Sequence, residues 1–128
     1  MFLINYYLIM QEIYIDDTGK GFPLVLVHGF LGSSAMWTLQ KEFLSKYFRV
    51  ITPALPGFGE SSKVKSLNSI NAMANIILEM LKKKNISKFN LMGHSMGGMI
   101  VQEIAKVSGD KINKLICYAT GSIGDIPG

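Results

Sequence analysis

The sequence predicts an α/β fold in which a mostly parallel sheet carries helices on both faces. Short apolar segments typical of strands alternate with longer segments whose apolar residues recur at helical spacing. The prominent glycine-rich turns each follow a strand-like segment, and the carboxyl ends of parallel strands meet at the sheet edge where ligands bind. The 128 residues have the size of one domain, and a hydrophobic content of 48% can fill its core.

The chain begins with the apolar stretch MFLINYYLIM, which lacks the basic segment and the small-residue cleavage site of a signal peptide. Two interpretations stay open: residues 1–9 are an upstream extension before a true start at Met10, or they form a short edge strand. Glu12–Asp16 alternates polar and apolar residues before a turn, which predicts an outer antiparallel strand. We expect one domain over residues 1–128.

The next segments supply two strands and the helix between them. Leu24–Val27 is a continuous apolar run, as in a strand that is covered on both faces. Ser34–Phe48 has apolar residues near helical spacing, and Ser33 or Ser34 is placed to cap this helix. Arg49–Thr52 is strand-like, and a proline follows it.

The second half of the chain continues the alternation. Leu67–Lys84 is predicted to be helical, with one apolar face made of Ile70, Met73, Ile77, Met80 and Leu81. Lys88–Met92 is a strand, Met96–Val107 is a helix with Gly109 beyond its end, and Lys114–Tyr118 is a further strand.

Composition excludes several classes of function. The 13 basic and 9 acidic residues give a net charge of +4, but the basic residues do not interleave with aromatics, so we expect no nucleic-acid partner. The cluster Lys82-Lys83-Lys84 ends a helical segment, where cations complement the helix dipole. Cys117 is the only cysteine, which excludes an internal disulfide and favours a reducing compartment, the cytoplasm. No apolar run is long enough to span a bilayer.

The pentapeptide Gly93-His94-Ser95-Met96-Gly97 fits the pattern G-x-S-x-G between a predicted strand and a predicted helix. A serine on such a sharp turn has a strained backbone and an exposed hydroxyl. Both glycines are needed because side chains there would collide with the neighbouring strand and helix. Ser95 is therefore the predicted nucleophile, and the backbone N–H of Met96, at the positive end of the helix, is a predicted oxyanion donor.

A second turn, His28-Gly29-Phe30-Leu31-Gly32, follows the strand LVLV. A second oxyanion donor is expected at this place, as a backbone N–H. We assign it to Phe30, with Leu31 as the alternative, and His28 and Gly29 as supporting residues. The other interpretation is that the glycines only shape a tight turn.

The segments LVLVHGFLGSS, PALPGFGESS and NLMGHSMGGMIVQEIA resemble the α/β-hydrolase fold family, in its branch of serine-dependent enzymes for small molecules. The resemblance runs from about Glu12 to the end of the chain and implies the N-terminal part of the fold, without its later strands and lid. It implies hydrolysis of small esters, thioesters or lactones through an acyl-enzyme on Ser95, with no cofactor and no metal. Ala54 departs from the family, which often has aspartate there, and this concerns the stability of the turn.

The family places its catalytic acid and histidine after the nucleophile. Only His28 and His94 exist here, and both precede Ser95. We expect the ring of His94 to point away from the serine hydroxyl and His28 to anchor its loop through hydrogen bonds. Asp125 lies where some members carry the acid, but an exposed loop aspartate is the simpler interpretation. The acid and the base are therefore expected to be missing from this chain.

Two classes of function follow. The chain is a serine hydrolase whose acid and base lie elsewhere, or it is an inactive remnant or interaction module with the same fold. Because no later strand in the sequence covers Lys114–Tyr118, we expect self-association through this edge, or association with a missing C-terminal half.

Overall fold

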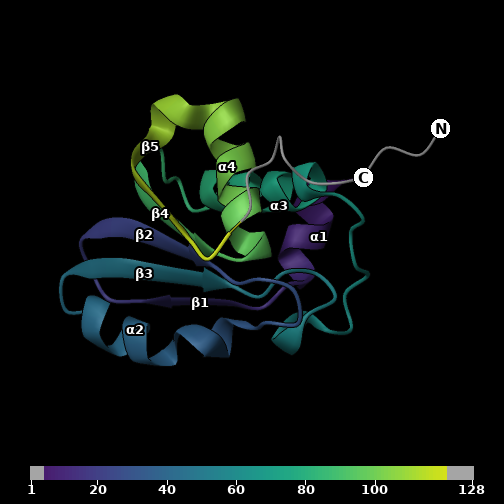
Figure 1. Cartoon of the computed structure of the whole chain (residues 1–128), viewed down its shortest axis with the longest axis horizontal. Helices are drawn as coiled ribbons and strands as arrows, with labels where there is room; N and C mark the ends of the chain where they lie inside the picture. Colours follow the sequence, from purple (N-terminus) through teal and green to yellow (C-terminus); the bar gives the residue numbers. More distant parts are fainter. Residues whose placement is uncertain (1–4, 121–128) are drawn as a thin grey trace.

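The computed structural model describes residues 5–120, which contain one five-stranded sheet in the order β1-β3-β2-β4-β5 (Figure 1). The strands are β1 (Ile15–Thr18), β2 (Phe22–Val27), β3 (Phe48–Pro53), β4 (Phe89–His94) and β5 (Ile112–Tyr118). β1 pairs with β3 in the antiparallel sense, and all other neighbours are parallel. The predicted class and the outer antiparallel strand are confirmed.

Helices cover both faces of this sheet. They are α1 (Tyr6–Glu12), α2 (Thr38–Leu44), α3 (Ile70–Lys83) and α4 (Met96–Ser108), with short 3-10 turns at η1 (Ser34–Trp37), η2 (Gly59–Ser61) and η3 (Gly109–Lys111). Figure 1 shows α2 on one side of the sheet and α1, α3 and α4 on the other. The larger core lies under α3 and α4, and a smaller one under α2 consists of Leu24, Leu26, Trp37 and Val50.

The N-terminal segment differs from one of the two interpretations of the sequence, because residues 6–12 form helix α1 instead of an edge strand. The Asn5 side chain accepts a hydrogen bond from the Leu8 N–H (3.1 Å) and caps the helix. Met10 and Ile13 are buried in the larger core, next to α3. Tertiary contact with α3 therefore decides the conformation, and β1 begins at Ile15, after the predicted start at Glu12.

The predicted helix over residues 34–48 is also divided. Ser34–Trp37 is a 3-10 turn, α2 ends at Leu44, and Phe48 already belongs to β3. The predicted cap is wrong, because the Ser33 side chain makes no capping hydrogen bond. Ser34 instead donates its hydroxyl to the Glu60 carboxylate (2.6 Å), so a long-range contact replaces the local one.

The helix α3 begins at Ile70, three residues after the predicted start, where the Ser69 hydroxyl accepts from the Ala72 N–H (3.0 Å). Its predicted apolar face is confirmed: Ile70 packs against the larger core, and the other four residues, Met73, Ile77, Met80 and Leu81, are buried in it. Among the helices in residues 5–120, none has the length and apolar character needed to cross a membrane.

Ion pairs join β1 to the elements around it. The Asp17 carboxylate accepts two hydrogen bonds from Arg49 on β3 (2.7 and 2.9 Å) and one from Lys84 after α3 (2.7 Å). The hydrogen bonds from Arg49, supported by the one from Lys84, lower the pKa of Asp17 to about 2 against the opposing effect of burial. Lys84, which is predicted to complement the helix dipole, also pairs with a carboxylate.

Candidate active site

Ser95 forms the sharp turn between β4 and α4. Its backbone angles, φ 57° and ψ −121°, lie in a region that side-chain-bearing residues rarely adopt. A conformation of this kind costs on the order of 1–3 kcal/mol and persists only where the surrounding structure enforces it. The strained turn that the sequence predicts at this serine is confirmed.

The two glycines of the pentapeptide are required by close approach. A Cβ at Gly97 would lie 2.6 Å from the carbonyl oxygen of His28, and it would also overlap that of Val27. A Cβ at Gly93 would lie 2.7 Å from the Gly98 nitrogen. The end of β4, the start of α4 and the end of β2 therefore meet without room for a methyl group.

The hydroxyl of Ser95 is not used to cap the helix that follows it. Serine at an N-cap normally accepts a hydrogen bond from the second or third N–H of the helix. Here the Gly98 N–H donates to the Ser95 carbonyl oxygen (2.9 Å), and the Ser95 side chain makes no capping hydrogen bond. Within residues 5–120 the Oγ therefore lies at the positive end of α4 without a hydrogen bond to the start of that helix.

The turn after β2 lies directly against this serine. A Cβ at Gly29 would be 2.9 Å from the Ser95 Cβ and 3.3 Å from the Met96 nitrogen. The structure thus brings together two glycine-rich motifs that lie far apart in the sequence. Phe30 follows Gly29, and its side chain is 66% exposed and contacts Phe58 edge to face (5.6 Å).

His28 is fully buried and anchors two loops, as predicted. Its Nε2 accepts a hydrogen bond from the Leu55 N–H (2.9 Å), so the proton of the neutral ring is on Nδ1, which donates to the Gly29 carbonyl oxygen (2.8 Å). Burial lowers the pKa of His28, against a smaller effect of the Gly29 carbonyl. With both ring nitrogens engaged, His28 has no free position for accepting a proton from Ser95.

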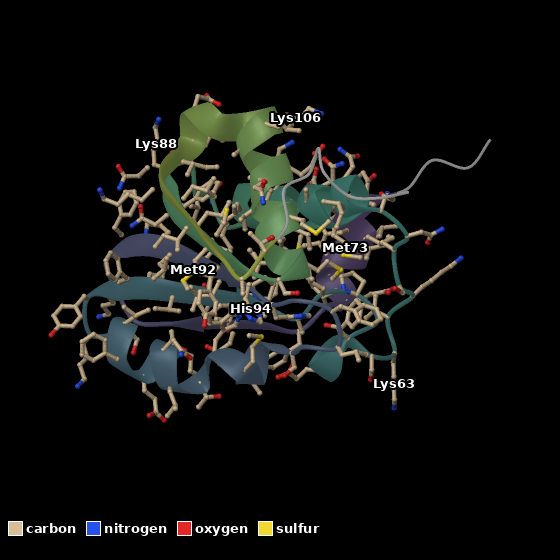
Figure 2. All side chains as sticks on the ribbon, in the orientation of Figure 1. Lys63, Met73, Lys88, Met92, His94 and Lys106 are labelled. Carbon is tan, nitrogen blue, oxygen red and sulfur yellow. The ribbon has the colours of Figure 1, made fainter. Side chains whose placement is uncertain are left out.

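His94, labelled in Figure 2, is the last residue of β4. Its ring lies against the Tyr118 ring, with centroids 5.2 Å apart and planes tilted by 31°. Within residues 5–120 no hydrogen bond joins His94 to Ser95. Asp125, which lies where some members of the family carry the acid, is outside the described residues.

The turn with Ala54 is held by a residue that the sequence analysis missed. The buried Ser61 donates its hydroxyl to the Ala54 carbonyl oxygen (2.8 Å) and accepts from the Tyr14 N–H (2.9 Å). The Ala54 N–H in turn donates to the Tyr14 carbonyl oxygen (2.8 Å). These bonds hold the turn at the position where the family often has aspartate. The sequence shows two adjacent serines, Ser61 and Ser62, as candidates for such a contact. Only the fold shows that Ser61 is the buried one.

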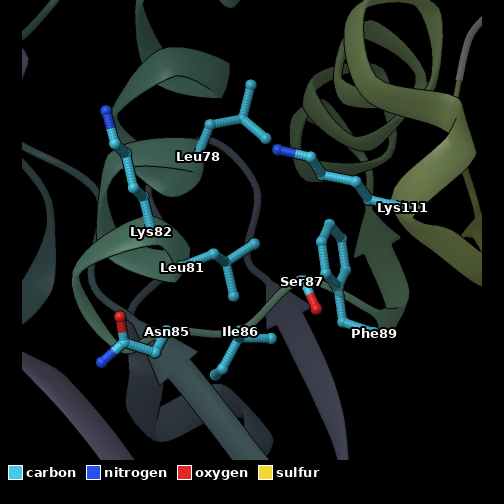
Figure 3. A pocket seen from close by; sticks show the side chains of 8 residues that line it. All are labelled: Leu78, Leu81, Lys82, Asn85, Ile86, Ser87, Phe89 and Lys111. Carbon is cyan, nitrogen blue, oxygen red and sulfur yellow. The ribbon is translucent and has the colours of Figure 1, made fainter.

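A pocket of about 320 Å³ lies at the other end of β4 (Figure 3). It is lined by Leu78, Leu81, Lys82, Asn85, Ile86, Ser87, Phe89 and Lys111. Phe89 begins β4, whereas Ser95 follows its last residue, and six residues of extended chain span about 20 Å. None of the candidate site residues borders this pocket.

Comparison with known proteins decides the family. The sequence model of the alpha/beta hydrolase fold family matches residues 23–126. The chain belongs to the alpha/beta hydrolase fold family. A solved structure of a thermophilic esterase from Thermogutta terrifontis is 37% identical, with a TM-score of 0.83 over 90% of this chain and 43% of the esterase.

Two curated proteins are also similar to this chain in sequence. A dihydrolipoyllysine-residue acetyltransferase component of an acetoin cleaving system from Pseudomonas putida is 35% identical over 82% of this chain and 28% of its own length. A pimeloyl-[acyl-carrier protein] methyl ester esterase from Nitrosomonas europaea is 31% identical over 87% of this chain and 42% of its own length. The chain thus spans less than half the length of these relatives.

Proposed function

We propose that this chain carries the nucleophile and oxyanion hole of a serine hydrolase for small-molecule esters, thioesters or lactones. The observation that carries the proposal is the hydroxyl of Ser95, which makes no capping hydrogen bond and lies on a strained turn at the start of α4. The similar proteins that are named as esterases support this class of substrate.

The Ser95 Oγ attacks the carbonyl carbon of the substrate, and the carbonyl π electrons move onto the oxygen. The backbone N–H groups of Met96 and Phe30 are proposed to donate to this oxyanion, as preorganised dipoles do in acyl transfer. When the carbonyl re-forms, the alkoxide or thiolate leaves and an ester to Ser95 remains; water then releases the acid. The base that removes the hydroxyl proton is proposed to come from residues other than His28 and His94.

The second candidate is an inactive interaction module. Its support is that His28 and His94 are engaged elsewhere and that no other histidine exists in the sequence. The two candidates differ in what Ser95 does, so the reactivity of this one hydroxyl separates them.

The test is the reaction of the 128-residue chain with a large excess of an alkyl fluorophosphonate, followed by intact mass and peptide mapping. We expect slow modification at Ser95 alone and none in Ser95→Ala. Hydrolysis of a p-nitrophenyl ester should be slow or undetectable, because oxyanion hole and binding alone leave only residual catalysis. No modification of Ser95 would favour the interaction module, and rapid ester turnover lost in Ser95→Ala would place the base in this chain.

We also propose the cytoplasm as the compartment. Its support is Cys117, the single cysteine, which has no partner for a disulfide in the chain. Fractionation of the expressing cells tests this, and recovery from an oxidising compartment would contradict it.

A further inference from the structure

The backbone of Ser95 is held from both sides by one short segment, Tyr118–Thr120, at the end of β5. The Ser95 N–H donates to the Tyr118 carbonyl oxygen (3.0 Å). Two residues later, the Thr120 hydroxyl donates to the Ser95 carbonyl oxygen (2.8 Å). Ala119 between them has φ 49°, so the chain bends and brings both groups to the same residue.

Gly98, at the start of α4, leaves room for the Thr120 side chain. A Cβ at Gly98 would lie 2.8 Å from the Thr120 Cγ2, so a side chain at this position would displace Thr120. The Gly98 N–H donates to the same Ser95 carbonyl oxygen (2.9 Å) that accepts from Thr120. That oxygen therefore receives two donors, which fill both of its lone pairs.

This arrangement bears on the nucleophile because the Ser95 conformation is strained. Strained backbone angles persist only where contacts on both sides of the residue oppose relaxation. The hydrogen bond that the Ser95 N–H donates to Tyr118 restrains the amide before the Ser95 Cα, and the hydrogen bond donated by Thr120 restrains the carbonyl after it. Only the second of these is made by a side chain, so only it can be removed by substitution.

We propose that Thr120 is a positioning residue for Ser95: its hydroxyl holds the Ser95 carbonyl and thereby the backbone conformation that presents the Oγ. The consequence for reactivity rests on the proposed function of Ser95 as nucleophile. The consequence for conformation does not rest on it, and the two are measured separately.

The first measurement is NMR of the isotope-labelled 128-residue chain. Thr120→Val keeps the shape of the side chain and removes the hydroxyl, whereas Thr120→Ser keeps the hydroxyl. We expect the Ser95 Cα and Cβ chemical shifts, which depend on φ and ψ, to move in Thr120→Val and to stay at the wild-type values in Thr120→Ser. The Gly98 amide should exchange faster in the valine variant. If the valine variant does not fold, Thr120→Ala against Thr120→Ser is a second pair that differs only by the hydroxyl.

The second measurement is the rate of fluorophosphonate modification of Ser95. We expect a loss of about fivefold in Thr120→Val, the equivalent of one net hydrogen bond, and recovery in Thr120→Ser. Unchanged Ser95 shifts in Thr120→Val would overturn the proposal, as would equal effects of the valine and serine variants. Absence of modification in the wild type would count against the proposed function alone, because the chemical shifts still decide the role of Thr120.

Discussion

The neighbouring strands β4 and β5 both contain apolar residues, but their surroundings are opposite. They pair in parallel, with Met92 opposite Ile116 and His94 opposite Tyr118. In β4, Phe89 and Leu91 are fully buried, whereas the side chains of Ile116 and Tyr118 in β5 are 50% and 59% exposed. Apolar sequence makes both segments strands, but only neighbouring elements decide whether a strand is covered. The Ser95 turn follows the covered strand and is hydrogen-bonded to the end of the exposed one.

The largest effect on stability is expected at the closely packed end of β4. Gly97→Val should lower the free energy of unfolding by about 3 kcal/mol or more, because the side chain would overlap backbone oxygens that cannot move apart cheaply. Chemical denaturation followed by circular dichroism measures this. Gly109→Ala is the matched control, with nothing within 4 Å of the added Cβ, and should change stability by less than about 0.5 kcal/mol. Equal effects of the two substitutions would contradict the packing described for the turn.

The next effect concerns the loop after β2, which packs against the Ser95 turn. His28→Ala should cost about 2–3 kcal/mol, because the buried Leu55 N–H loses its acceptor and a cavity remains. Since burial lowers the pKa of folded His28 below its usual 6.5, the unfolded chain binds a proton that the folded chain rejects. Wild-type stability should therefore fall as the pH decreases below about 6.5. Denaturation curves across this range should show a weaker slope in His28→Ala; the same slope would exclude His28 as its source.

A smaller effect is expected on association through β5. The wild-type chain should self-associate at micromolar concentration, because an exposed apolar edge strand pairs with other chains. Ile116→Lys should shift sedimentation toward the monomer. Leu39→Lys is the matched control, since Leu39 is a 75% exposed leucine on α2, away from this edge, and should leave association unchanged. A wild-type monomer that binds no hydrophobic dye would show that the exposed strand is not an association surface.

The smallest effect is expected at Met96, whose proposed role lies in its backbone. Met96→Leu keeps the N–H and is close in volume, so the rate of fluorophosphonate modification of Ser95 should change by less than about twofold. A loss of tenfold or more, with unchanged stability, would mean that the side chain takes part in the reaction.

Much of the fold and of the site could be predicted because it depends on local patterns. The period of apolar residues predicts β2, α3 and α4, and the glycines around Ser95 predict a turn that no larger residue could form. The role of His28 as a loop anchor followed from its place next to Gly29, and its two hydrogen bonds confirm it. The roles of Ser61 and Thr120 could not be predicted, since both depend on partners in other elements.

The sequence by itself determined the alternation of strands and helices, the parallel sheet and the place of the strained serine. Each of these follows from residue types within a few positions of one another, through side-chain periodicity or the steric freedom of glycine. The tertiary structure decided that residues 6–12 are helical, that the predicted helix over residues 34–48 divides, and that Thr120 reaches Ser95. These outcomes depend on contacts between residues far apart in the chain, whose energies no local pattern contains.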